Sequence, residues 1–289
     1  MGEIFRSCRQ NPVALKYLLL LPFIFLFSCQ NQDSPAVEPD DDDDVTIPVA
    51  QDTVPFEVFQ FADSATLVQA YQNSPQVVFR VNTLVPKSSN EILNILINTE
   101  LAKIIAGEEA PISVTNLPQT IKVASRTVLY NYKKQDVDTA DLAERWSDYS
   151  LEQHYQTEAL LNTDKLLTLA TNHYYYAGGA HGNHYTVLHT FATDSVQLLQ
   201  FEDIFLPGLA AELEALLTQK AIALGIALQT ETVLVTKNIA FTKEGLLFGY
   251  PPYEIASYAD GEIEIVLPYA EVSHLLTEQG EMLAGGLVR

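Results

Sequence analysis

The amino-terminal segment is the feature of this sequence that most constrains the class of protein it encodes. Residues 17–27 form an apolar run, YLLLLPFIFLF, that follows a stretch with three basic residues and one acidic residue. The run is shorter than the roughly 20 residues that span a bilayer core, and a basic stretch before a short apolar run is typical of an export signal. We therefore expect residues 1–28 to be a signal peptide, so that the mature chain begins at Cys29.

The end of this signal resembles the lipobox of bacterial lipoproteins. Leu26 is the aliphatic residue and Ser28 the small residue before Cys29, although Phe27 is bulkier than is usual there. An ordinary signal-peptidase site and an uncleaved anchor are the alternatives. Acyl chains on Cys29 would tether the protein to a lipid bilayer. We expect a lipid-anchored protein of the cell envelope, and Gln30 after the cysteine favours the outer membrane if the organism has one.

Cysteine count and charge exclude several classes of site and partner. The other cysteine, Cys8, lies in the signal, so the mature chain can form neither an internal disulfide nor a zinc-thiolate cage. The signal removes three positive charges and one negative charge, which takes the net charge from −21 to −23. Such acidity argues against a nucleic-acid partner and against a basic membrane-binding face. No sequence motif calls for a cofactor.

Residues 29–54 are expected to form an acidic disordered tether. They contain the run Asp40 to Asp44 and no basic residue, so they repel one another and bury little apolar surface. A calcium loop is the alternative reading of the aspartates, but such a loop alternates its ligands and needs a glycine bend. A solvated spacer is favoured.

The remaining chain is expected to be α+β, with two antiparallel sheet domains and helices on one side. We place the first domain at residues 55–164, the second at residues 165–276 and a loose C-terminal tail at residues 277–289. The first domain is expected to contain strands at 56–61, 76–85, 121–132 and 151–161, a helix at 90–106, and a short helix capped by Thr139 with Leu142, Trp146 and Tyr149 on one side. The second is expected to contain strands at 165–176, 184–191, 238–242, 246–250 and 262–267, and helices at 209–224 and 269–276.

No catalytic or metal-binding constellation stands out. Five of the six histidines fall within 36 residues, but no Asp or Glu occurs from residue 165 to 193. His184 and His189 would point to opposite faces of a strand, so they favour no metal site unless a carboxylate arrives through the tertiary fold. The chain has neither a G-x-S-x-G elbow nor a P-loop lysine.

Two segments remain as candidates for function. Residues 173–183, HYYYAGGAHGN, are best explained as a hairpin whose glycines supply the turn. Residues 250–261, YPPYEIASYADG, carry three tyrosines on a proline-stiffened stretch. Rigid aromatic residues on such a loop could anchor a glycan ring or a protein cleft, and a buried connection packed on the sheet is an equal alternative.

These two segments carry a resemblance to a known family. GGAHGN, then LLQFEDIF, FTKEGLLF, PPYEIASYADG and IVLPY resemble the domain of unknown function 3298. Residues 56 to about 165 resemble its usual upstream partner, which is named after a peptidoglycan deacetylase and a sigma-factor regulator. The resemblance implies an extracytoplasmic α+β module. Some relatives are fused to a transmembrane anti-sigma segment and recognise lysozyme, and others precede a polysaccharide deacetylase domain.

The resemblance also suggests site residues and partners. In the lysozyme-recognising relatives the proline-tyrosine loop is expected to enter the lysozyme cleft, and that loop maps onto Pro252, Tyr253 and Tyr258. We expect neither anti-sigma release nor deacetylation to carry over. The leading hypothesis is a non-catalytic module that binds a wall glycan, peptidoglycan, or a basic lysozyme-like enzyme. The alternatives are an enzyme or accessory subunit acting on peptidoglycan, with His181 as acid or base, and a structural envelope partner.

Overall fold

The structure is a computed structural model that describes residues 53–288, apart from residues 70, 108–109, 139 and 141. The expected signal peptide, Cys29, nearly all of the expected tether and the expected cap Thr139 lie outside the described residues. The described residues belong to one compact unit. No helix within this described part is both long and apolar enough to cross a membrane.

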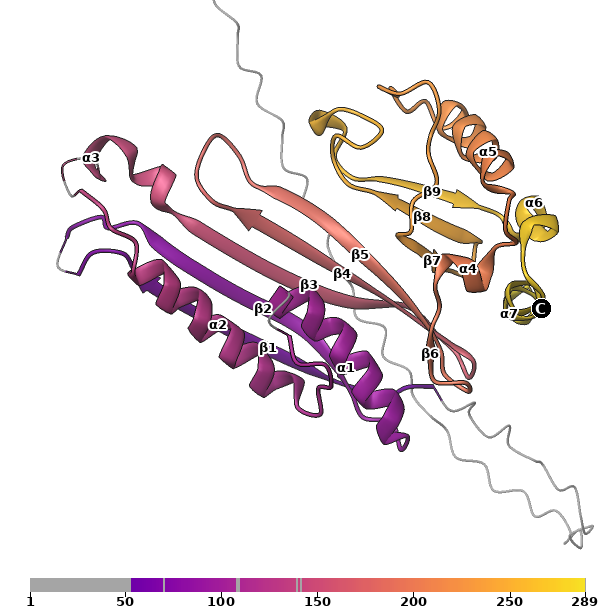
Figure 1. The fold of residues 1–289 in the computed structure, drawn as a ribbon, viewed down its shortest axis with the longest axis horizontal. Helices are drawn as coiled ribbons and strands as arrows, with labels where there is room; N and C mark the ends of the chain where they lie inside the picture. Colours follow the sequence, from indigo (N-terminus) through magenta and orange to yellow (C-terminus); the bar gives the residue numbers. More distant parts are fainter. Residues whose placement is uncertain (1–52, 70, 108–109, 139, 141, 289) are drawn as a thin grey trace, which may run out of the picture. The chain divides into compact units, whose positions relative to one another are not determined.

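A six-stranded sheet forms the larger part of the fold (Figure 1). Its strands follow one another in chain order: β1 (Phe56–Thr66), β2 (Gln76–Pro86), β3 (Leu151–Asn162), β4 (Leu166–Tyr176), β5 (Asn183–Ala192) and β6 (Gln197–Leu198). The α+β class is confirmed, but the sheet is mixed, because β2 pairs with β3 in parallel. The expectation of antiparallel pairing throughout is wrong here. The helices between β2 and β3 return the chain to the end where β2 began, as a parallel crossover requires.

Helices α1 (Glu91–Ala106) and α2 (Leu117–Lys133) cover one face of this sheet. The expected strand at 121–132 is wrong, because these residues belong to α2. Asn116 caps the helix and Pro118 occupies its first turn, where the missing N–H costs nothing. The buried positions recur every three or four residues: Leu117, Ile121, Ser125, Leu129 and Tyr132.

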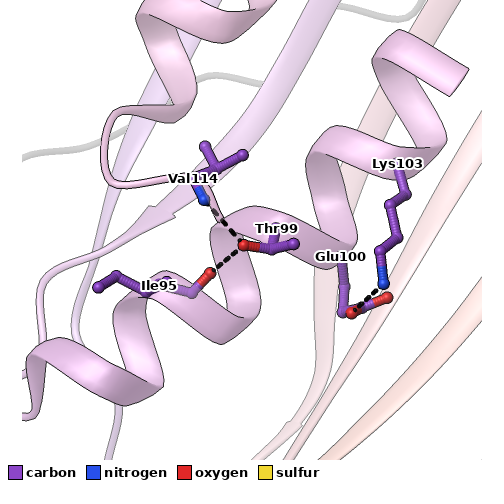
Figure 2. A network of polar contacts seen from close by, with 5 residues as sticks. All are labelled: Ile95, Thr99, Glu100, Lys103 and Val114. Carbon is purple, nitrogen blue, oxygen red and sulfur yellow. Dashed lines mark hydrogen bonds and ion pairs between the residues drawn. The ribbon is translucent and has the colours of Figure 1, made fainter. Parts of the chain in front are cut away.

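Polar contacts hold α1 to the segment that follows it (Figure 2). The Thr99 hydroxyl donates to the Ile95 carbonyl at 2.7 Å and accepts from the Val114 backbone N–H at 3.0 Å. One turn further on, Lys103 pairs with Glu100 at 2.7 Å. These contacts satisfy buried polar groups beside the core that α1 and α2 share with the sheet.

We call the face of the six-stranded sheet opposite α1 and α2 the open face. A three-stranded antiparallel sheet packs against this face. It consists of β7 (Ile239–Phe241), β8 (Leu246–Tyr250) and β9 (Ile263–Leu267). It contacts β4 and β5 through a small apolar cluster of Ala170, Leu188, Ala240 and Leu247. The other side of the small sheet shares a core with the helices α4 (Phe201–Ile204), α5 (Ala210–Ala223), α6 (Tyr269–Val272) and α7 (Glu278–Leu287).

The structure differs from the expected domain division at residues 164 and 165 and from the loose tail expected at residues 277–289. The division between residues 164 and 165 falls in the turn between β3 and β4, and these strands pair along their length, so it lies inside the six-stranded sheet. The loose tail expected at 277–289 is wrong, because α7 forms there. Thr277 caps α7 by accepting from the Gly280 backbone N–H at 3.0 Å, and Leu283 is buried.

Candidate functional site

Two segments about 70 residues apart in the sequence meet in the fold. One is the turn between β4 and β5, and the other is the connection between β8 and β9 (Figure 1). The Tyr258 ring stacks on His181 at 4.0 Å between centroids, and its hydroxyl donates to the Gly182 carbonyl at 2.6 Å. The Tyr253 ring lies against Tyr258, with 5.4 Å between the ring centroids. We call His181, Tyr258 and Tyr253 the aromatic stack.

The β8–β9 connection is held at several points. Ile255 and Ala256 are buried, and a reciprocal capping box between Ser257 and Asp260 closes the short 3-10 helix that carries Tyr258. The connection is thus partly a buried one, as one alternative predicted. Tyr253, in contrast, is 61% exposed.

The backbone at Tyr253 is strained. It has a φ of 72°, a left-handed conformation that costs a residue with a side chain about 1 to 2 kcal/mol. Pro252 is half-buried directly before it. The structure therefore places the rings of Tyr253 and Tyr258 against each other, and it adds His181 as the third ring.

A groove crosses the open face beside the small sheet. It consists of two cavities of about 540 and 570 Å³, and Gln156 and Asn172 line both. We call these two cavities together the open-face groove. Along the first cavity lie Gln60, Arg80, Asn82, His154 and Tyr174. Along the second, beside β9, lie Glu158, Thr186, Thr242, Glu264 and apolar side chains.

The aromatic stack adjoins this groove through Tyr174. A Cβ atom at Gly182 would lie 2.5 Å from the Tyr174 ring, so glycine is needed where the ring crosses the turn. Tyr174 lines the groove, and the carbonyl of the same Gly182 accepts from Tyr258. The aromatic stack therefore lies next to the side of the groove that Tyr174 lines.

Hydrogen bonds order the polar floor of the groove. The Asn172 amide donates to the Thr186 hydroxyl at 3.2 Å, and Thr186 donates to Glu262 at 2.7 Å. The second oxygen of the Glu262 carboxylate is buried and has no hydrogen-bond partner among the described residues. Arg80 lies 3.4 Å from His154, and burial, followed by the Arg80 charge, lowers the pKa of His154. His154 is therefore expected to be neutral at pH 7.

The histidines are distributed over both faces. His189 lies on the face that carries α1, next to Glu100 and Lys103, whereas His184 pairs with Tyr174 on the open face, as the strand period predicted. His173 is buried between Tyr155 and Tyr185, and burial lowers its pKa to about 4. Across the described residues, no group of three or more His, Cys, Asp and Glu side chains is placed to hold a metal ion.

Sequence reasoning missed the groove. The signal was present in β3, where Glu152, His154, Gln156 and Glu158 occupy every second position. Such an alternation predicts a polar sheet face, but it does not tell whether that face is flat or hollowed. The hollow arises because β9 and the turn between β7 and β8 lie beside β3 and β4, and this arrangement depends on contacts that are distant in sequence.

Family comparisons agree with the resemblance drawn from the sequence. Residues 202–270 match the family described as "Protein of unknown function (DUF3298)", and residues 71–184 match the family described as "Deacetylase PdaC". Among curated proteins, none matches this chain.

Two crystal structures share the fold. One is a member of the DUF3298 family from Bacteroides fragilis NCTC 9343, with 23% identity, a TM-score of 0.69, and coverage of 81% of this chain and 97% of that chain. The other is a DUF3298 family protein from Pseudomonas aeruginosa PAO1, with 16% identity, a TM-score of 0.54, and coverage of 78% and 96%. The chain thus carries a DUF3298 segment, with a PdaC-type domain upstream of it, on a fold shared with DUF3298 proteins.

Proposed function

We propose that this protein is a non-catalytic binding module for a glycan strand of the bacterial cell wall, tethered in the envelope through lipid on Cys29. The observation that carries the proposal is the aromatic stack at the side of a groove lined by amides and hydroxyls. Ligand sites combine a concave surface with a few placed polar groups, and each of the two cavities has a volume within the usual range for such sites.

The chemistry of the groove suits a sugar. Gln156 and Asn172 each offer an amide that can both donate and accept, as sugar hydroxyls and acetamido groups require. The exposed ring of Tyr253, which stacks on Tyr258, offers apolar area for the C–H face of a pyranose ring. Amides and aromatic rings lie on neighbouring parts of the same surface.

The site is also preorganised. Tyr258 is fixed by its hydrogen bond to Gly182 and by its contact with His181, so little side-chain freedom remains to be lost on binding. Tyr253 remains exposed at a strained backbone position. Strain of this kind persists where the surrounding structure enforces it, and it is concentrated at functional sites.

A second candidate is capture of a basic lysozyme-like enzyme by the same loop. Exposed Tyr253 on a strongly acidic protein supports it, because a net charge of −21 for the whole chain would steer a basic partner toward the surface. The two candidates differ in what they require. Capture needs only the loop, whereas glycan binding needs the groove floor as well.

Co-sedimentation of the full chain with insoluble peptidoglycan tests the proposal. We expect binding at physiological salt and a loss of roughly 30-fold in affinity for the double variant Gln156→Ala and Asn172→Ala, since two hydrogen bonds are worth about 2 kcal/mol. The matched control removes the exposed side chains of Gln135 and Gln229, which lie outside the groove. No sedimentation of the unaltered chain, or equal loss in both double variants, would refute the proposal.

A calorimetric titration with lysozyme separates the second candidate. Capture predicts binding that survives physiological salt, falls in Tyr253→Ala and is unchanged in the groove variant. Binding that disappears with salt would be a general attraction between acidic and basic proteins, and the capture hypothesis would then be abandoned.

A further inference from the structure

A third cavity on the molecule is lined by the single tryptophan of the chain. Trp146 lies in the short 3-10 helix η2 (Trp146–Tyr149) and is 56% exposed. The sequence grouped it with Leu142 and Tyr149 on one side of a helix, but Leu142 is buried and Trp146 is not. Tryptophan carries a large apolar surface and is usually well buried, so this degree of exposure calls for an explanation.

The cavity has a volume of about 730 Å³ and mixed aromatic and polar walls. Trp146 and Tyr176 supply rings, and Gln76, Ser150 and Glu152 supply amide, hydroxyl and carboxylate groups. The rings offer flat apolar area, while the polar groups can both donate and accept hydrogen bonds. A hydrocarbon ligand would leave those polar groups without partners, and a small ion would leave the rings unused.

The cavity adjoins the open-face groove along the strands. Glu152 of this cavity lies two residues from His154 on β3, and Tyr176 lies two residues from Tyr174 on β4. Residues two apart on a strand share a face, so the cavity around Trp146 and the open-face groove open on the same face of the sheet. Glu152 and His154 also contact each other at 3.5 Å.

One turn connects the Trp146 helix with the aromatic stack. Gly178 of the β4–β5 turn lies so close to the Asp148 backbone that a Cβ there would be 2.8 Å from it. Further along the same turn, His181 and Gly182 contact Tyr258. The turn is therefore pinned from both sides, which fixes the cavity and the stack relative to each other.

We propose that the cavity around Trp146 is a further sugar subsite, which binds a pyranose ring of the same glycan strand beyond the open-face groove. This inference rests on the proposed function and adds a place that the strand occupies. It predicts that affinity increases with oligosaccharide length, because a short oligomer cannot fill the groove and the subsite together.

The single tryptophan makes the subsite directly observable. We would titrate the full chain with the hexamer of N-acetylglucosamine, recording heat and tryptophan emission in parallel. The expected result is a change in emission with the same midpoint as the heat, together with reduced quenching by acrylamide. Trp146→Ala is expected to weaken the hexamer about tenfold, and Trp146→Phe, which keeps a ring, much less.

A matched control is Tyr130→Ala, which removes an exposed ring from α2, away from both cavities. If the hexamer binds by heat but leaves emission and the affinity of Trp146→Ala unchanged, the subsite is refuted while the groove stands. If the hexamer gives no heat with the unaltered chain, the proposed function itself fails and the subsite fails with it.

Discussion

Acidification is expected to destabilise this fold through His173. The ring is buried, stacks on Tyr155 at 4.2 Å and contacts the Tyr185 hydroxyl at 3.1 Å through Nδ1. Its Nε2 has no partner in the part of the chain that the structure describes. Burial lowers its pKa from 6.5 to about 4. In the unfolded chain His173 is therefore protonated below about pH 6.5, whereas in the folded chain it is protonated only below about pH 4. Stability is level above pH 7 and falls as the pH decreases through that window.

The size of the effect follows from the two pKa values. At pH 5 the unfolded state gains about 2 kcal/mol relative to pH 7.5 from this one group, and residual solvent contact reduces the figure to about 1 to 2 kcal/mol. With a urea dependence of about 3 kcal/mol per molar for a chain of this size, the unfolding midpoint moves down by roughly 0.5 M.

Urea unfolding of the full chain at pH 7.5 and pH 5 measures this shift. Burial also lowers the pKa of His154 and His189, so part of the acid sensitivity remains when His173 is replaced. The comparison is therefore with His173→Phe, which keeps a ring against Tyr155 and should lose about 0.5 M less than the unaltered chain. Equal losses in both proteins would mean that His173 accepts a proton in the folded state, and the burial argument would be wrong.

Three further changes test the contacts that build the site. Asn238→Ala removes hydrogen bonds to three backbone groups on β5 and β8 and should cost about 2 to 4 kcal/mol in urea unfolding; a cost under 0.5 kcal/mol would contradict their role. Gly245→Ala would push a methyl group into the Leu267 carbonyl at a φ of 155° and should lower the melting temperature by several degrees, which an unchanged melting curve would disprove. Tyr258→Phe removes the donor to Gly182 and should cost about 1 kcal/mol, with no loss expected only if that hydrogen bond is absent in solution.

Local sequence patterns predicted most elements but misassigned α2. Ile121 and Val123, and further on Val128, Tyr130 and Tyr132, alternate in a way that imitates a half-buried strand. In the fold Val123 and Tyr130 are 50% and 58% exposed, so the apparent period of two does not reflect burial. The cap at Asn116 and the proline after it were the stronger signals.

Long-range features could not be predicted from local patterns. The parallel pairing of β2 with β3 depends on where two helices return the chain, and nothing in either strand encodes it. The sequence indicated Tyr253 and Tyr258 as a pair and assigned His181 to a separate hairpin. Only the tertiary fold places the Tyr258 ring on His181.

A crystal structure of the full chain with the hexamer of N-acetylglucosamine tests the central claim most directly. We predict sugar rings over Gln156 and Asn172, with one ring against the face of Tyr253. Sugar bound only elsewhere, such as between α1 and α2, or an empty groove at saturating hexamer, would contradict the account.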